Sequence, residues 1–274
     1  MRKTRFAMLL VSAMSIGACS DPSGLDPTLA PSVPLAYTRF VNAVADTGAS
    51  DWRFIDQLEY SPIALGLTFR NFSPYQGTAP GARKLRIFPT STDINVTQQF
   101  FVDTTITFAA STYYTIVHLG YARTGQSPAD GILVLVDTIP TVAATSIAVR
   151  TLHLGLSLAN QDVFASPTAG ALPATPLVAN LAYRGTSGYL TQTPGALVLR
   201  TTNTGTTTVN ATATAPAGAA ADATNNLTAI GGSTIGGSAF TGFYFPRSVA
   251  LSSAPQTTAF TAPAIVYLVD RHPK

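Results

Sequence analysis

Short runs of alternating apolar and polar residues recur along this chain from about residue 36 onward. Leu85 and Ile87, for example, alternate with Arg86, and a period of two is typical of half-buried β-strands. The run 132–136 is continuously apolar and of strand length, which predicts a strand buried on both faces. In this part of the chain we predict strands near residues 37–44, 51–58, 66–72, 84–89, 99–109, 112–119 and 131–137.

The same residues recur at matched spacings in the second part of the chain. Arg39 and Asp51 recur as Arg150 and Asp162. Further pairs are Tyr75 with Tyr189, Pro80-Gly81 with Pro194-Gly195, Leu85-Arg86 with Leu199-Arg200, and 132–137 with 265–270. Such self-similarity indicates two tandem copies of one unit.

Seven short strands in a copy, separated by turn signals, predict a Greek-key, immunoglobulin-like β-sandwich. We therefore expect an all-β protein with one module at 36–143 and a second at 144–274. The second module carries a Thr/Ala/Gly-rich insertion near 201–238, which we interpret as longer strands and loops. The Pro-Gly pair of each copy fits a type II turn.

The first residues have the composition of a bacterial export signal. A basic start and an apolar stretch precede Ile16-Gly17-Ala18-Cys19, which resembles the lipobox of lipoproteins. We predict a signal peptide at 1–18, a lipid on Cys19 and a flexible tether over 19–35, with an r.m.s. span of roughly 20 Å. The alternative is an ordinary signal cut after Ala18. In a Gram-negative host, Ser20 in place of Asp favours the outer membrane.

The net positive charge of the chain lies in the predicted signal peptide. The chain is 46% hydrophobic and only 11% charged, with a formal net charge of +3. Arg2, Lys3 and Arg5 account for that excess, because the remaining basic residues equal the 13 acidic residues in number. The mature protein has no basic field of the kind that binds nucleic acid.

Candidate chemistry is sparse. The three histidines, His118, His153 and His272, stand in different settings, and the single cysteine is assigned to the lipid. We expect His118 and His272 to be rim or solvated residues. The sequence predicts no catalytic residue, no cofactor and no metal site, since zinc ligands would need close spacing.

The repeated polar and aromatic residues have two interpretations each. Arg39 with Asp51, and Arg150 with Asp162, form either a ligand-binding pair in each copy or a structural contact, such as packing or a strand-to-strand ion pair. The structural contact is the simpler explanation. Four aromatic residues offer either a sugar-binding face or, as we expect, core and interface packing. They are Trp52, Tyr60, Tyr75 and Tyr189.

The first copy resembles a known family. Its segments Arg39-Phe40-Val41-Asn42-Ala43, Asp51-Trp52-Arg53-Phe54, Ser73-Pro74-Tyr75 and Pro80-Gly81 resemble the bacterial domain of unknown function 4397, over about residues 36–140. The second copy is a weaker match, with His153-Leu154 in place of Asn-Ala. The resemblance implies a secreted or lipid-anchored envelope protein with tandem β-sandwiches, and it transfers no active site.

These observations favour a non-enzymatic binding or surface-architecture protein of the cell envelope. Its expected partners are the membrane, through the lipid on Cys19, and a polysaccharide or another envelope protein. The alternative is a hydrolase that acts on envelope polysaccharide with a scattered pair of carboxylates.

Overall fold

The first half of the described chain folds into a β-sandwich. The structure, a computed structural model, describes residues 34–56, 61 and 63–273. The strands of this module are β1 (Ala36–Asn42), β2 (Ser50–Phe54), β3 (Ile63–Leu67), β4 (Gln76–Thr78), β5 (Gly81–Pro89), β6 (Val102–Phe108), β7 (Tyr113–Leu119) and β8 (Gly131–Val136), with the short helix α1 (Ile94–Thr97) before β6. They form two sheets with the orders β4-β1-β7-β8 and β3-β2-β5-β6, and β1 runs parallel to β7.

The second half repeats this arrangement strand by strand. Its elements are β9 (Ile147–His153), β10 (Gln161–Ser166), β11 (Val178–Leu181), β12 (Thr186–Gln192), β13 (Val198–Asn203), β14 (Val209–Thr214), β15 (Ala239–Phe245), a 3-10 turn (Thr258–Phe260) and β16 (Ala264–Arg271). The sheets are β12-β9-β15-β16 and β11-β10-β13-β14, and β9 runs parallel to β15. The predicted pair of tandem β-sandwiches is confirmed. The two modules share one strand order, and each has eight strands where we expected seven.

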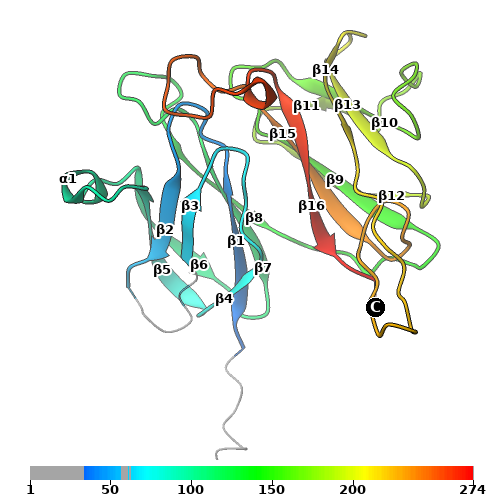
Figure 1. Ribbon diagram of the computed structural model, residues 1–274, viewed down its shortest axis with the longest axis horizontal. Helices are drawn as coiled ribbons and strands as arrows, with labels where there is room; N and C mark the ends of the chain where they lie inside the picture. The colour runs from blue at the N-terminus through cyan, green and yellow to red at the C-terminus, as the bar shows by residue number, and fades with distance from the viewer. Residues whose placement is uncertain (1–33, 57–60, 62, 274) are drawn as a thin grey trace, which may run out of the picture. The chain divides into compact units, whose positions relative to one another are not determined.

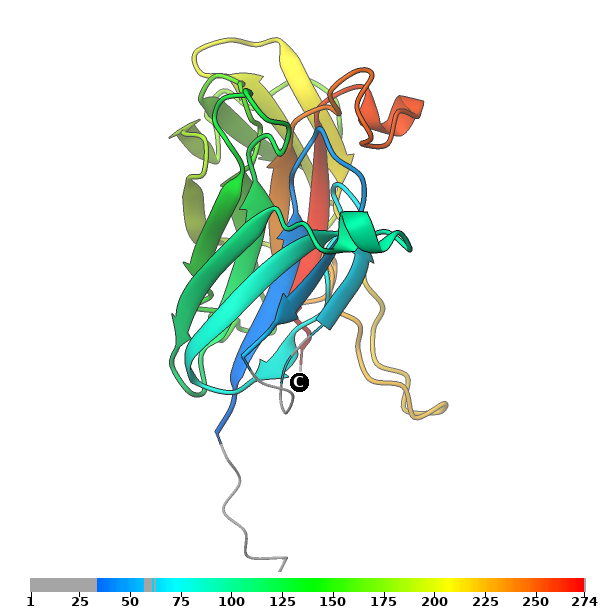
Figure 2. The ribbon, with the colours of Figure 1, turned by 90° about the vertical axis from the view of Figure 1, so that its left-hand side faces the viewer.

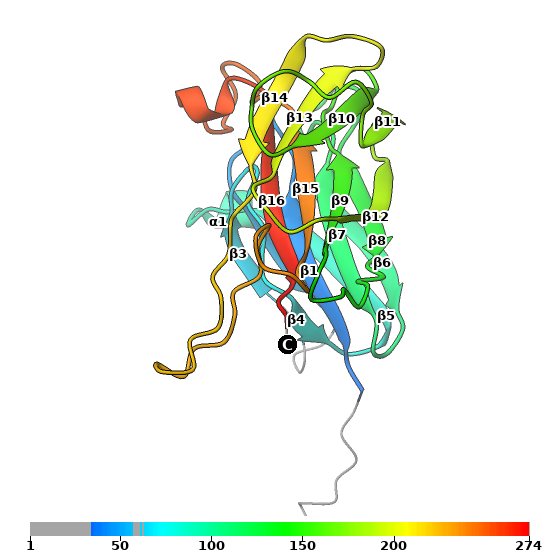
Figure 3. The ribbon, with the colours of Figure 1, turned by 90° about the vertical axis from the view of Figure 1, so that its right-hand side faces the viewer.

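The two sandwiches pack through their inner sheets, β4-β1-β7-β8 and β12-β9-β15-β16, so that four sheets stack as layers (Figure 1). Val41 and Val117 of the first module share one hydrophobic core with Leu152, Phe243 and Leu268 of the second. The outer sheets, β3-β2-β5-β6 and β11-β10-β13-β14, lie toward the viewer in Figures 2 and 3 respectively. Each outer sheet encloses a further core with its own inner sheet.

Burial follows from this layering. Strands β1, β7, β9 and β15 lie in the middle of the inner sheets and are buried almost throughout. The prediction that 132–136 is buried on both faces is wrong. Strand β8 is only half-buried, and Val136 is exposed, because β8 is the edge strand of its sheet. Six of the seven predicted strands coincide with observed ones. The strand predicted at 66–72 is misplaced, because β3 ends at Leu67, and β4 was not predicted.

The insertion of the second module is mostly the connection between β14 and β15. This connection covers 215–238, whereas the equivalent connection between β6 and β7 covers only 109–112. Isolated bridges join Ala219 to Ile230 and Asp222 to Leu227, which makes the segment a narrow hairpin that projects from the sandwich (Figures 2 and 3). It is a loop rather than a further domain, as predicted. The predicted longer strands are wrong, because β13 and β14 have 6 residues each, whereas β5 and β6 have 9 and 7.

The two Pro-Gly pairs differ in their turns. Gly81 has a φ of 97°, the positive value that a type II turn requires after proline. Gly195 does not belong to the glycines with positive φ, so the predicted type II turn of the second copy is wrong. Its backbone N–H instead donates to the Ser233 carbonyl, at 2.8 Å, at the base of the long hairpin.

Candidate functional site

Arg39 of β1 begins a chain of polar contacts within the first module. Its Nε donates to the Thr115 hydroxyl at 2.7 Å, and that hydroxyl donates to Oδ2 of Asp137. The Tyr75 hydroxyl donates to the same carboxylate oxygen at 2.8 Å. The Arg39 guanidinium lies 4.5 Å from the centroid of the Tyr75 ring, within the range of a cation–π contact.

The second module repeats this chain with equivalent residues. Arg150 Nε donates to the Thr241 hydroxyl at 2.9 Å, and Thr241 donates to Oδ2 of Asp270 at 2.7 Å. The Tyr189 hydroxyl donates to the same oxygen at 2.8 Å, and the Arg150 guanidinium lies 4.7 Å from the Tyr189 ring centroid. We call these eight residues of the two modules the Arg–Asp cluster.

The two halves of the Arg–Asp cluster are joined by crossed ion pairs. Arg39 Nη1 of the first module lies 2.7 Å from Asp270 Oδ1 of the second. Arg150 Nη1 of the second module lies 2.7 Å from Asp137 Oδ1 of the first. Each module therefore supplies an arginine to the other module's aspartate, which is the reciprocity of an isologous interface.

Burial makes these contacts expensive to break. The side chains of Asp137 and Asp270 are fully buried, and those of Arg39 and Arg150 are 1% and 5% exposed. Burial raises the pKa of the Tyr75 and Tyr189 phenols above the ordinary value, so both stay protonated as donors to the carboxylates. Removing one member of such a buried pair costs about 3–5 kcal/mol, because its partner keeps a buried charge.

The repeated aspartates Asp51 and Asp162 do not pair with the repeated arginines. Asp51 Oδ1 accepts the backbone N–H of Gly66 at 2.8 Å. Asp162 Oδ1 likewise accepts a hydrogen bond from the backbone N–H of Asn180 at 2.8 Å. Gly66 and Asn180, the two donors, both have positive φ. Each aspartate lies at a shift in strand register. These residues have structural roles, as expected, but neither the ligand-binding pair nor the ion pair suggested within a copy is formed.

A second pair of arginines also reaches across between the modules. Arg70 of the first module donates to the backbone carbonyls of Pro246, Ala259 and Ala262 in the second. Arg184, its counterpart, donates to the Ile132 carbonyl of the first module at 3.3 Å. Both arginines have positive φ, and burial lowers the pKa of Arg70 to about 10.

The aromatic candidates do not gather into a sugar-binding face. Trp52 is fully buried in the core of the first module, and Tyr75 and Tyr189 lie in the Arg–Asp cluster. The expectation of core and interface packing is confirmed for these three, whereas Tyr60 lies outside the described residues.

The burial of the histidines differs in part from the expectation. His118 is fully buried, and its Nε2 lies 2.9 Å from Asp130 Oδ2, so the prediction of a rim or solvated position is wrong for it. His153 is also fully buried, which lowers its pKa, and it contacts the Ala159 carbonyl at 3.1 Å through Nε2. His272 is exposed, as expected.

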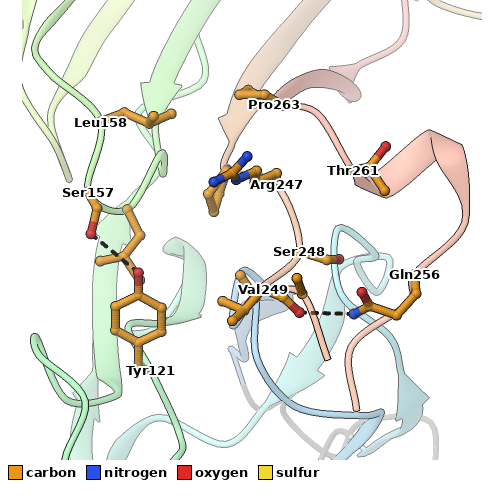
Figure 4. A pocket seen from close by; sticks show the side chains of 13 residues that line it. Tyr121, Ser157, Leu158, Arg247, Ser248, Val249, Gln256, Thr261 and Pro263 are labelled. Atoms are coloured by element: carbon orange, nitrogen blue, oxygen red, sulfur yellow. Dashed lines mark hydrogen bonds between the residues drawn. The ribbon is translucent and has the colours of Figure 1, made fainter. Parts of the chain in front are cut away.

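A pocket of about 710 Å³ lies where loops of the two modules meet (Figure 4). The first module contributes Ala45, after β1, and Tyr121, after β7. The second module contributes 156–158, after β9, and residues of the connection between β15 and β16, among them Arg247. Pairs of equivalent loops therefore form its walls.

The lining of this pocket mixes apolar groups with hydroxyls and one charge. Leu156, Leu158 and Val249 provide apolar surface. The Tyr121 and Ser157 hydroxyls lie 3.3 Å apart on one wall (Figure 4). Arg247 is the one charged residue of the lining, and no carboxylate belongs to it.

Sequence reasoning missed the residues that line the pocket and the second arginine pair. One signal was present, because Phe69-Arg70 and Tyr183-Arg184 recur at the spacing that relates Tyr75 to Tyr189. Tyr121 and Arg247 each stand two residues after the equivalent strands β7 and β15, but their residue types differ, so repetition could not reveal them.

Over the part of the chain that the structure covers, no three His, Cys, Asp or Glu side chains are grouped so that they could hold a metal ion. Within the same residues, no helix is long and apolar enough to cross a membrane. The predicted signal peptide at 1–18 and Cys19 lie outside the described residues, as does the predicted tether apart from residues 34 and 35.

Comparison with known proteins bears on the first module above all. The sequence model of a family described as "Domain of unknown function (DUF4397)" matches residues 36–164, which cover the first sandwich and the start of the second. The curated proteins contain no match to the chain. Residues 36–164 of the chain are therefore similar to the DUF4397 family.

Proposed function

We propose that this protein is an exported, lipid-anchored protein of the bacterial cell envelope that binds a ligand in the pocket between its two modules and catalyses no reaction. The pocket carries the binding part of this proposal. Its volume of about 710 Å³ suits a small ligand, and ligand sites occur preferentially at interfaces between domains.

The contacts between the modules support a pocket of fixed shape. The Val249 backbone N–H donates to the Ala45 carbonyl at 2.8 Å, which ties one wall to the other module. Arg70 holds the Pro246 carbonyl in the same loop. A site whose walls are already in place loses less entropy when it binds a ligand.

The alternative function, hydrolysis of envelope polysaccharide, finds less support in this pocket. A glycosidase of the common type needs two carboxyl groups that flank the scissile bond. The carboxylates of Asp137 and Asp270 are committed to buried ion pairs, and those of Asp51 and Asp162 accept backbone N–H groups. None of these four lines the pocket.

The lipid anchor is tested by the variant Cys19→Ala in the full-length chain. We expect the wild type in the membrane fraction and the variant in the soluble fraction, because the sulfur that carries the lipid is gone. Metabolic labelling with a radioactive fatty acid should mark the wild type only.

Ser20→Asp is the matched control for this experiment. It leaves the cysteine intact, so this variant should stay membrane-bound, and in a Gram-negative host it should move from the outer to the inner membrane. Unchanged membrane association of Cys19→Ala would contradict the proposed anchor.

A further inference from the structure

Arg247 occupies the pocket without a counter-ion. Its guanidinium makes no ion pair and no hydrogen bond with any other residue in the described ranges, and it points into the hollow between the two walls (Figure 4). Arg247 is an exposed residue of the pocket lining. A cation without a partner in such a lining is suited to bind an anionic group, and arginine binds carboxylates in bidentate geometry.

The backbone on either side of Arg247 is held in place. The preceding carbonyl, of Pro246, accepts from Arg70 Nη2 at 2.5 Å. The following N–H, of Ser248, donates to the Phe260 carbonyl at 2.8 Å. The guanidinium therefore extends from a fixed base, as a positioned binding group does.

The rest of the lining suits a sugar ring better than an alkyl chain. Hydroxyl and amide groups of Tyr121, Ser157, Thr261 and Gln256 are distributed around the pocket, among them the Tyr121–Ser157 pair at 3.3 Å. Apolar side chains lie between these groups. A saccharide presents apolar C–H faces and hydroxyl edges, whereas a fatty-acid chain would need a continuous apolar wall.

Tyr121 and Arg247 occupy equivalent positions in the two modules, each two residues beyond the central strand β7 or β15. They face the pocket from its two sides (Figure 4). The duplicated fold thus places an aromatic ring in one module and a guanidinium in the other. A single ligand bound between them would meet a stacking surface and a cation together.

We infer that the pocket between the modules binds an acidic saccharide, with the carboxylate of a uronic acid on Arg247 and the sugar ring against Tyr121 and the apolar lining. This inference rests on the proposed binding function of the pocket and is independent of the lipid anchor.

Isothermal titration calorimetry on the detergent-purified full-length protein tests this ligand class. The probes are D-glucuronate, D-glucose, which differs in lacking the carboxylate, and decanoate, a carboxylate on an alkyl chain. We expect glucuronate to bind at least about tenfold more tightly than glucose, the size of one charge-assisted contact. Decanoate should bind more weakly than glucuronate.

Three variants define the site. Arg247→Gln should bind glucuronate and glucose with about equal affinity, because the charge is lost. Ala250→Trp, at an exposed lining residue, should block all binding by filling the pocket. Arg53→Gln removes the same charge from an exposed strand residue outside the pocket lining and should bind as the wild type does.

The outcomes separate the ligand class from the binding function. Equal binding of glucose and glucuronate, tighter binding of decanoate, or a preference that survives Arg247→Gln would overturn the acidic saccharide and leave the pocket as a binding site. If none of the probes binds in a manner that Ala250→Trp abolishes, the ligand class and the binding function of the pocket both fail, whereas the anchor is decided by fractionation alone.

Discussion

At the scale of single residues, repetition identified the right residues but not their partners. Arg39 and Arg150 recur in β1 and β9, and each contacts an aspartate of the opposite module, Asp270 or Asp137. A sequence shows which residues are repeated, but it cannot show that a pair crosses from one copy to the other. That depends on which faces of the two sandwiches pack together.

The crossed pairs predict strong energetic coupling between modules. In a double-mutant cycle with Arg39→Met and Asp270→Asn, each single change should cost about 3–5 kcal/mol of unfolding free energy, since it leaves a buried group without its partner. The double variant should lose less than the sum, by about 2–3 kcal/mol. Urea unfolding at neutral pH measures the unfolding free energy of the wild type, the two single variants and the double variant.

The surface pair Arg83–Asp56 is the control for that cycle. Its side chains are 23% and 29% exposed and lie 3.3 Å apart, so solvent screens the interaction and the coupling should be below about 1 kcal/mol. Additive effects of Arg39→Met and Asp270→Asn would show that the buried contact does not join the modules energetically.

At the scale of elements, the hydrophobic pattern of the sequence predicted most strands. It missed the features that depend on which strands lie next to each other in the fold. Alternation and apolar runs located six strands of the first module and placed the seventh, β3, too late in the chain. Strand β4 has only three residues, Gln76–Thr78, and its pairing with β1 comes from the tertiary fold. The burial of β8 was overestimated because nothing local distinguishes an edge strand from a central one.

Asp162 of β10 is expected to make a pH-dependent contribution to stability. The backbone N–H of Gly205, together with that of Asn180, holds the pKa of Asp162 below its ordinary value against the opposing effect of burial. At neutral pH, Asp162→Ala should lower the unfolding free energy by about 1–3 kcal/mol, because both N–H groups lose their acceptor.

Acid should remove this difference. The ionised carboxylate stabilises the native state above the unfolded pKa of about 3.9, and the advantage disappears as the pH falls through the lower native pKa. Urea unfolding of wild type and Asp162→Ala at a series of pH values measures the convergence. Asp162→Asn keeps one acceptor oxygen without titrating and should lie between them at neutral pH. A gap that widens on acidification would contradict this role.

At the scale of the whole molecule, the layering explains the low charged fraction. Two of the four sheets are covered on both faces, so their central strands need no solvated side. Threonine occupies fully buried positions such as Thr38, Thr115 and Thr241. A chain with 11% charged residues is therefore consistent with a folded protein whose polar groups are partly inside.

The central claim is that the two sandwiches share a core and form one folding unit, which fixes the pocket between them. Differential scanning calorimetry of the full-length chain tests it most directly. We predict a single transition with calorimetric and van't Hoff enthalpies in a ratio of about 1, and Asp270→Asn should lower the midpoint of that whole transition. Two separable transitions, of which Asp270→Asn shifts only one, would contradict the claim.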